Sequence, residues 1–286
     1  MPDRTPHRRT RRLGPANPPG STTLMASHYT DFYAEVYRTH WWWRAREENV
    51  LRYLAEFRSW PVGQATILDI GCGDGLMWPQ LERLGAVEGI EPDAGMIADD
   101  SPWRSRIEVA DLLQARLRDR RYDLILMLDV LEHIADDDAG LTRAASMLAD
   151  GGILLLTVPA MPALWSEWDL LSGHHRRYTR HSLAAVVRSA GLRPLELRYF
   201  YSWTVLPLLL RRLFFRADQA EHSHFSQPPS EPVNSAALRV SRLDHRLTRR
   251  VPVPFGSSLI AVLSAAEDGR RQSRAGRDQA RSFCAD

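Results

Sequence analysis

A predicted strand that ends in a glycine turn constrains the fold of this chain most. Residues Thr66–Ile70 form an apolar run rich in β-branched side chains, and Gly71-Cys72-Gly73-Asp74-Gly75 follows at once. Helical spacing then resumes over residues 76–84. Closely spaced glycines allow a tight turn and let the backbone approach a ligand where side chains would collide. The pattern therefore predicts a ligand at the carboxyl end of this strand.

Predicted strands and helices alternate along most of the chain. Helical spacing also covers residues 29–57, before the first strand. The later predicted strands cover residues 87–91, 107–110, 122–128, 153–158, 195–200 and 258–264. The predicted helices cover residues 136–149, 179–190 and 233–250, and a helix begins at residues 93–98. Gly151-Gly152 are predicted to close the first of these helices, and the last is predicted to point Leu238, Leu243 and Leu247 inward. Alternation of this kind favours an α/β doubly wound sheet.

The composition divides the chain into segments. Residues 1–26 predict a disordered basic extension, 27–200 the ligand-binding α/β domain with N-terminal capping helices, 201–256 an insertion on the substrate side, 257–266 the last strand, and 267–286 a disordered tail. The insertion is predicted to hold a linker at residues 227–232.

The charged residues exclude several classes of function. All 37 basic residues are arginine, so chemistry through a lysine Schiff base or a P-loop lysine is excluded. Residues 1–24 carry five arginines and one aspartate, which leaves the remainder with 32 basic and 34 acidic residues. A body with that balance does not predict nucleic acid as a partner. Cys72 and Cys284 predict no disulfide, and without an apolar signal segment we expect a cytoplasmic protein.

Acidic residues follow or close the predicted strands. Glu91 comes 22 residues after Asp69, at the end of the second strand, where a carboxylate accepts hydrogen bonds from ribose hydroxyls. A dinucleotide turn has the spacing G-x-G-x-x-G, whereas this turn reads G-x-G-x-G. Asp69 before the turn suits a cationic amino group better than a pyrophosphate. The pattern favours S-adenosylmethionine, with a nicotinamide dinucleotide as the alternative.

Four segments carry a resemblance to a known family. Residues 67–75 (ILDIGCGDG), 87–93 (VEGIEPD), 122–134 (YDLILMLDVLEHI) and 148–158 (LADGGILLLTV) resemble the successive motifs of class I S-adenosylmethionine-dependent methyltransferases. Two further segments, 40–46 (HWWWRAR) and 173–179 (GHHRRYT), resemble those of a bacterial branch that acts on small molecules. The resemblance implies a seven-stranded Rossmann-like sheet, with residues 258–264 antiparallel between the fifth and sixth strands.

The resemblance also implies the cofactor-binding residues. They are Asp69, Gly71, Cys72, Gly73 and Gly75 around the methionine part, Glu91 and Pro92 at the ribose, Asp111 and Leu112 at the adenine, and Asp129 beside the sulfonium.

Two histidines are candidates for the chemistry. His133 follows the fourth strand and His174 lies in the loop after the fifth, so both fall at the ligand-binding rim, where either can deprotonate a hydroxyl. Structural roles stay open: His133 can pair with Glu132 or the acidic run after it, and His174 can order its loop.

Candidates for acceptor binding lie in the two branch segments. They are Trp42, Arg46, Arg176, Arg177 and Tyr178. The two later arginines can hold a carboxylate or phosphate, or simply pair with Asp169 and Glu167. No metal site is expected, because His222 and His224 lie in a polar loop and Asp136–Asp138 suit a helix N-terminus.

The segment 199–216 is strongly apolar and aromatic, but its uncharged run is too short to cross a bilayer. It predicts a buried part of the domain, a helical apolar lid between strands six and seven, or a contact with a membrane interface. Such a lid favours a small or lipid-linked acceptor with an apolar portion, most simply methylated at oxygen. The alternatives are a nicotinamide-dependent oxidoreductase and a non-catalytic peripheral membrane protein that binds the adenosyl cofactor. The sequence predicts no oligomeric state.

Overall fold

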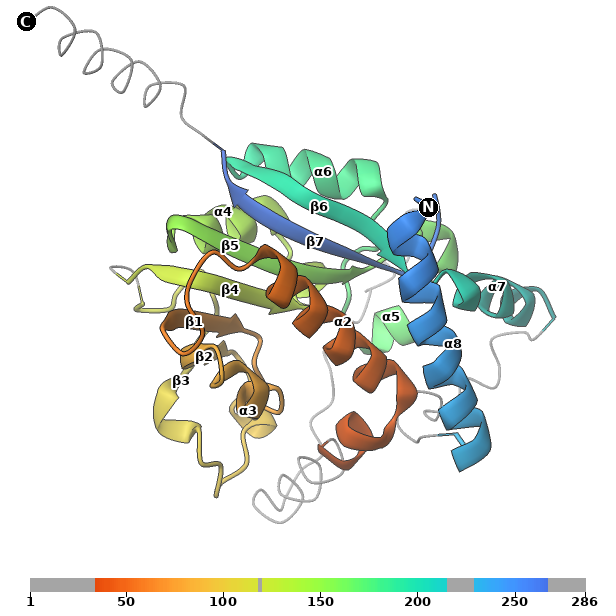
Figure 1. Ribbon diagram of the computed structural model, residues 1–286, viewed down its shortest axis with the longest axis horizontal. Coiled ribbons are helices and arrows are strands. Elements are labelled where there is room, and N and C mark those ends of the chain that lie inside the picture. The colour runs from red at the N-terminus through yellow and green to blue at the C-terminus, as the bar shows by residue number, and fades with distance from the viewer. Residues whose placement is uncertain (1–33, 118–119, 215–228, 267–286) are drawn as a thin grey trace, which may run out of the picture.

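The computed structural model describes residues 34–117, 120–214 and 229–266, which form one mixed β-sheet flanked by helices (Figure 1). The strands are β1 Ala65–Ile70, β2 Gly85–Glu91, β3 Ile107–Val109, β4 Tyr122–Leu128, β5 Leu148–Pro159, β6 Leu192–Phe200 and β7 Ser258–Ala265. The disordered ends predicted for residues 1–26 and 267–286, together with His222, His224 and Cys284, lie outside the described residues.

The strand order confirms the doubly wound sheet. The order is β3-β2-β1-β4-β5-β7-β6, and β7 runs antiparallel between β5 and β6, as the resemblance implied. The order reverses between β1 and β4, and open α/β sheets bind ligands at the carboxyl ends of strands at such a point. The glycine turn after β1 and the segment after β4 therefore share the edge where a ligand is expected.

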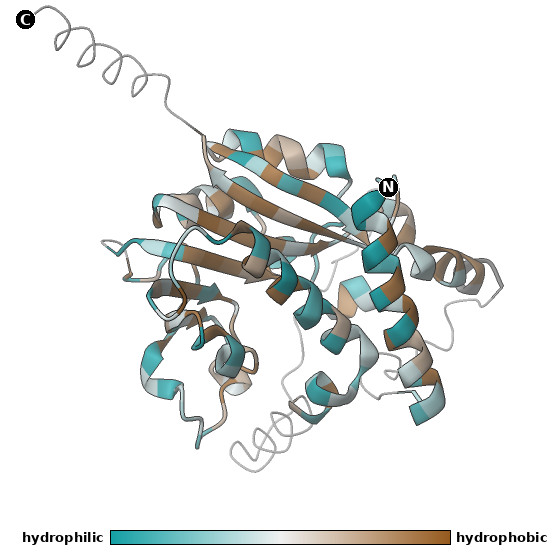
Figure 2. Ribbon diagram, in the orientation of Figure 1, coloured by the Kyte–Doolittle hydropathy of each residue, from teal (hydrophilic) through white to brown (hydrophobic). Residues whose placement is uncertain are grey.

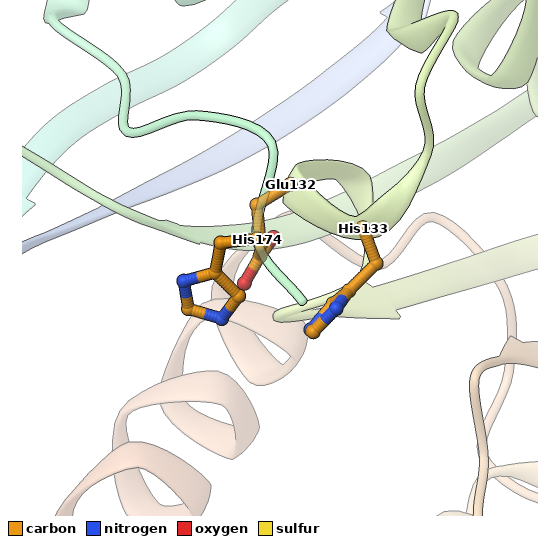
Figure 3. Close-up of side chains that lie close together, drawn as sticks. All are labelled: Glu132, His133 and His174. Carbon is orange, nitrogen blue, oxygen red and sulfur yellow. The ribbon is translucent and has the colours of Figure 1, made fainter. Parts of the chain in front are cut away.

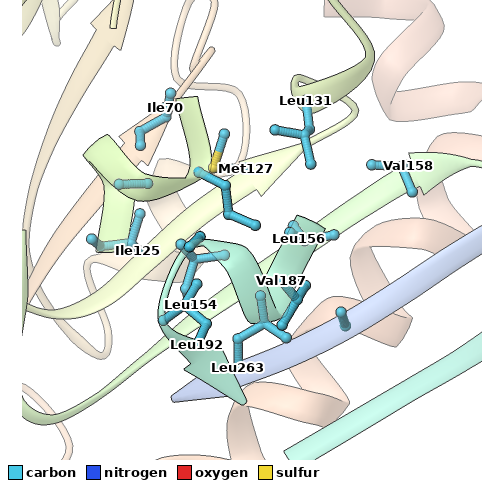
Figure 4. Packing of buried hydrophobic residues seen from close by; sticks show 14 of the residues in the cluster. Ile70, Ile125, Met127, Leu131, Leu154, Leu156, Val158, Val187, Leu192 and Leu263 are labelled. Carbon is cyan, nitrogen blue, oxygen red and sulfur yellow. The ribbon is translucent and has the colours of Figure 1, made fainter. Parts of the chain in front are cut away.

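Two layers of helices cover the sheet because its strands are apolar on both faces. On one face, α2 Trp41–Phe57 and the four-residue α3 Trp78–Leu81 pack with side chains such as Ile67, Leu124 and Leu155. On the other face, α4 Asp137–Ala145 and α6 Arg180–Ser189 pack with a second buried cluster (Figure 4). The cluster includes Ile70, Ile125, Met127, Leu154, Leu156, Val187 and Leu263.

Three predicted helices are shorter than the sequence pattern indicated. The helix expected over residues 76–84 is only α3, and that at 93–98 is the 3-10 helix Ala94–Met96. The helix expected over 136–149 ends at Ala145, because β5 begins at Leu148. Gly151 and Gly152 lie within β5 at a shift in its register with β4, so they do not close a helix.

The insertion between β6 and β7 begins with the 3-10 helix Ser202–Thr204 and continues through α7 Val205–Phe214 and α8 Glu231–Arg250. Leu238 is buried as predicted, but the prediction that Leu243 and Leu247 point inward is wrong, since they are 54% and 55% exposed. Polar contacts set the orientation of α8. Asn234 accepts a hydrogen bond from the Trp41 amide at 2.8 Å and donates one to the Thr39 carbonyl at 2.8 Å.

Exposed apolar side chains therefore run along the outer face of α8. They are Val233, Val240, Leu243 and Leu247, and the exposed arginines Arg239 and Arg246 lie among them. In Figure 2, brown and teal residues alternate along α8. Within the described ranges, no helix combines the length and the apolar character that crossing a membrane requires.

Candidate functional site

The glycine turn bends sharply because its three glycines adopt left-handed backbone angles. Gly71 has φ +71°, and a Cβ there would lie 2.5 Å from Cγ2 of Val130. Gly73 has φ +52°, but a Cβ there would meet no atom within 4 Å. Packing with the segment after β4 therefore requires the first glycine, whereas the second borders open space.

Asp69, the residue before Ile70 and the turn, lies in a buried position. Its side chain is 6% exposed, and the Trp78 indole Nε1 donates a hydrogen bond to Oδ2 at 2.9 Å. Burial raises the pKa of Asp69 to about 7, although the bond from Trp78 opposes the shift. A cationic group placed beside this carboxylate would favour its ionised form. The helical spacing over residues 76–84 gave no signal for this contact of Trp78 with Asp69.

Glu91, the last residue of β2, is hydrogen-bonded to the glycine turn. Its Oε2 accepts a hydrogen bond from the Gly73 amide at 2.9 Å, and its Oε1 accepts one from the Asp93 amide at 3.0 Å. Each oxygen keeps a lone pair that can accept from a further hydroxyl. Burial raises the pKa of Glu91, and the two amides oppose that shift. The arrangement fits the ribose-binding role that the resemblance implied.

The remaining cofactor candidates lie around this edge. Pro92 and Asp111 are exposed, and Asp111 Oδ1 accepts from the Leu113 amide at 2.8 Å. Leu112 is buried in the core, so only its backbone remains available to an adenine. Burial raises the pKa of the Cys72 thiol, which does not favour a nucleophilic role.

Asp129 directly follows β4 and has a left-handed backbone with φ +58°. Outside glycine such a backbone is strained, and strained residues concentrate at functional sites. Thr157 donates a hydrogen bond to Asp129 Oδ1 at 3.1 Å, and Arg46 pairs with Oδ2. The Arg46 guanidinium lies 4.4 Å from the ring centroid of Trp43 and 5.3 Å from that of Trp42. Arg46 thus neutralises the carboxylate that the resemblance placed beside the sulfonium.

The structure brings His133 and His174 together. Their ring centroids are 4.7 Å apart and their planes meet at 80°. His133 is open to solvent on part of its surface, but desolvation by the atoms around it and the neighbouring His174 lower its pKa. Glu132 lies beside them and is fully buried (Figure 3). We refer to Glu132, His133 and His174 as the Glu-His-His cluster.

Asp169, on α5 Glu167–Leu171, fixes His174 in place. Its Oδ1 lies 2.9 Å from His174 Nδ1 and accepts a hydrogen bond from Arg177 Nε at 2.7 Å. Burial disfavours the ionised form, but the bonds from His174 and Arg177 outweigh it and lower the pKa of Asp169 to about 2. The carboxylate is therefore ionised at neutral pH and orients the imidazole.

The other acceptor candidates in this loop make structural contacts. Arg176 pairs with Asp137 at 2.9 Å, while Arg177 pairs with Asp169. Tyr178 is 2% exposed and its hydroxyl donates to Asp137 at 2.8 Å. The geometry therefore favours the pairing alternative: Arg177 has the expected partner Asp169, whereas Arg176 pairs with Asp137 and not with Glu167.

Comparison with known proteins identifies the family. A model described as a methyltransferase domain matches residues 42–197, more than half of the chain. The chain belongs to the class I S-adenosylmethionine-dependent methyltransferases. S-adenosylmethionine is therefore its cofactor, and the nicotinamide and non-catalytic alternatives are set aside.

Named relatives and solved structures agree with this assignment. The ubiquinone biosynthesis O-methyltransferase of Cereibacter sphaeroides is 33% identical over 152 residues, which cover 46% of this chain and 61% of that protein. A SAM-dependent methyltransferase structure from Archaeoglobus fulgidus superposes with a TM-score of 0.52 at 17% identity, covering 82% of this chain and 99% of that one.

A second solved structure shows that the fold does not determine the methylated atom. The Haemonchus contortus phosphoethanolamine N-methyltransferase 2 in complex with S-adenosyl-L-methionine has a TM-score of 0.51 at 19% identity, covering 77% of this chain and 52% of that one.

The chain spans less than half the length of two further curated relatives. Both are ubiquinone biosynthesis O-methyltransferases, and the matched segments cover 41% and 36% of their lengths.

Proposed function

We propose that this methyltransferase transfers its methyl group to a hydroxyl oxygen of a small acceptor with an apolar portion. The observation that carries the proposal is the Glu-His-His cluster at the cofactor edge. Val130, which precedes the cluster in the chain, packs at the first glycine of the turn. A hydroxyl, unlike an amine, gains nucleophilicity when its proton is removed, and paired histidines suit that task.

The residues around the turn are proposed to hold the cofactor. S-adenosylmethionine supplies a methyl group on a sulfonium whose leaving group departs neutral, so the protein needs chiefly to position and desolvate the reactants. Asp69 would pair with the ammonium, and Glu91 would accept from the ribose hydroxyls. The open space at Gly73 leaves room for a ligand against the backbone. Trp78 would hold Asp69 in place.

The named relatives support oxygen as the methylated atom, since several are ubiquinone biosynthesis O-methyltransferases. The exposed apolar face of α8, with Arg239 and Arg246 among its side chains, supports an acceptor met at an anionic lipid surface. On α7, Leu206 and Leu210 are also exposed. They are consistent with contact between residues 199–216 and a membrane, which stays a prediction. Residues 215–216 lie outside the described residues.

Product analysis with paired acceptors tests this proposal. A water-soluble catechol and a prenylated catechol in anionic vesicles are each incubated with S-adenosylmethionine, and S-adenosylhomocysteine and methyl ethers are quantified. We expect one methyl ether per S-adenosylhomocysteine and at least about tenfold higher kcat/KM for the prenylated acceptor, because apolar burial adds binding energy. Methylation of amines alone would contradict oxygen transfer, and equal kcat/KM for both catechols would contradict an acceptor with an apolar portion.

The raised pKa of Asp69 predicts a pH-dependent affinity for the cofactor. An ammonium binds the carboxylate, so below a pKa of about 7 a proton must first leave Asp69. Calorimetric titration should give an affinity roughly eightfold lower at pH 6.0 than at pH 7.5. The pKa of Asp69 is higher in the folded protein than in the unfolded chain, so protonation of Asp69 stabilises the folded, ligand-free protein. This contribution to stability is fully present below the pKa of the unfolded chain and is lost as pH rises through about 7.

Asp69→Asn should bind weakly, with an affinity that no longer varies in this pH window. A variant that keeps the wild-type pH profile would contradict the assignment of the ammonium to Asp69.

A further inference from the structure

Glu132 is a buried carboxylate without a visible partner. Its side chain is 0% exposed, and neither Oε1 nor Oε2 has a hydrogen-bond partner among the described residues. Buried polar groups in proteins are almost always hydrogen-bonded, and a buried carboxylate pairs with a cation or takes up a proton. Both carboxylate oxygens of Glu132 are therefore available to a further ligand.

Two imidazoles adjoin this carboxylate. Glu132, His133 and His174 each offer one ligand atom, and these atoms lie within 4.8 Å of one another (Figure 3). Ligand atoms that share one ion at about 2.0–2.2 Å in a tetrahedral arrangement are about 3.3–3.6 Å apart, so the three side chains would have to close by roughly 1 Å to coordinate an ion. One carboxylate with two histidines is a donor set that suits Zn²⁺, Mn²⁺ or Fe²⁺ better than Mg²⁺ or Ca²⁺.

The surroundings prepare His174 to act as a ligand. Asp169 holds Nδ1 at 2.9 Å, so that nitrogen carries the proton and Nε2 presents its lone pair. A carboxylate behind a histidine in this way is the usual second partner of a metal ligand. The loop is fixed to the cluster as well, because the His175 amide donates to the Glu132 carbonyl at 2.8 Å.

We propose that the Glu-His-His cluster binds a divalent transition-metal cation through Glu132, His133 and His174. Three protein ligands leave open positions for water or an acceptor oxygen. The role of the ion in catalysis rests on the proposed function: it holds the acceptor hydroxyl and lowers its pKa, so that the proton passes to solvent. The deprotonated acceptor oxygen then forms a bond to the methyl carbon of S-adenosylmethionine. The bond between that carbon and sulfur breaks, and the electron pair of the broken bond stays on sulfur. The binding of the ion itself requires neither cofactor nor acceptor.

Metal titration of the full chain tests the site. Protein stripped with a chelator is titrated calorimetrically with MnCl₂ and with ZnCl₂, without cofactor or acceptor. We expect one ion per chain, and we expect Glu132→Gln and His174→Gln each to weaken binding by at least about 30-fold, as loss of a ligand should. His181→Gln on α6 is the matched control, a histidine outside the cluster, and should bind as the wild type does. Absence of binding, or equal binding in Glu132→Gln, would overturn the inference.

A second variant and a separate readout keep the test decisive. If Glu132→Gln fails to fold by circular dichroism, His133→Gln replaces it, because that side chain is exposed and its loss leaves the core intact. Methyl transfer is measured in parallel, with and without chelator. Bound metal with no methylated hydroxyl would overturn the proposed function and leave the site standing. Methylation of hydroxyls that is insensitive to chelation would overturn the metal's role alone.

Discussion

Replacing Gly73 with valine is expected to abolish S-adenosylmethionine binding while the protein stays folded. The side chain would project into the open space beside the turn, where a Cβ meets no protein atom within 4 Å. In the proposed function that space receives the cofactor, so the new methyl groups would occupy its position. The loss should exceed about 100-fold in affinity, or about 2.7 kcal/mol of binding free energy. Calorimetric titration with S-adenosylmethionine measures it.

Gly191→Val is the matched control for this prediction. Gly191, after α6, also has a left-handed backbone (φ +71°) and open space around its Cβ position. Both variants therefore impose a similar backbone strain, about 1–2 kcal/mol, and should lower the melting temperature alike. Only Gly73→Val should lose the cofactor. Equal affinities in the two variants would contradict the assignment of the cofactor to the turn.

The strands of the sheet were predictable because their signals are local. A β-branched apolar run before Gly71 and an unbroken apolar run at residues 124–128 each identify a strand without reference to distant residues. The place of β7 came from the resemblance. Helix ends were less predictable, since Gly151 and Gly152 read as a helix end but belong to an irregularity in β5.

The orientation of α8 could not be read from its own sequence. Leucines at positions 238, 243 and 247 predicted a common buried face, yet only Leu238 is buried. The contacts that decide the matter are distant: Asn234 bonds to the backbone of residues 39 and 41, and Asp244 accepts from the Ser202 amide at 3.1 Å. The spacing of hydrophobic residues along a helix carries no information about polar contacts of this kind with distant residues.

Much of the candidate site followed from residue type and position at strand ends. That reasoning identified Asp69, Glu91 and both histidines of the cluster. It could not show the pair of Arg46 with Asp129, whose members lie 83 residues apart, or the positive φ of Asp129. The sequence also placed Glu132 only as a partner for His133, because burial without a hydrogen bond is visible only in three dimensions.

His174→Asn is expected to lower kcat for methyl transfer by about 10²–10⁴-fold while the affinity for S-adenosylmethionine changes less than about twofold. The imidazole promotes loss of the hydroxyl proton in the proposed function, whether directly or as a metal ligand, but it contacts none of the residues proposed to hold the cofactor. Asparagine is small enough to stay in the loop and retains polar atoms that can face Asp169. Single-turnover kinetics with a hydroxyl acceptor separate the chemical step from product release.

His175→Asn provides the control within the same loop. His175 is exposed, and its contact with Glu132 is made by the backbone amide, which asparagine retains. Its kcat should therefore stay within about twofold of the wild type, as a surface substitution should. Equal losses in the two variants would indicate that the loop, and not the imidazole of His174, supports catalysis. A large loss of cofactor affinity in His174→Asn would instead move this histidine into the cofactor site.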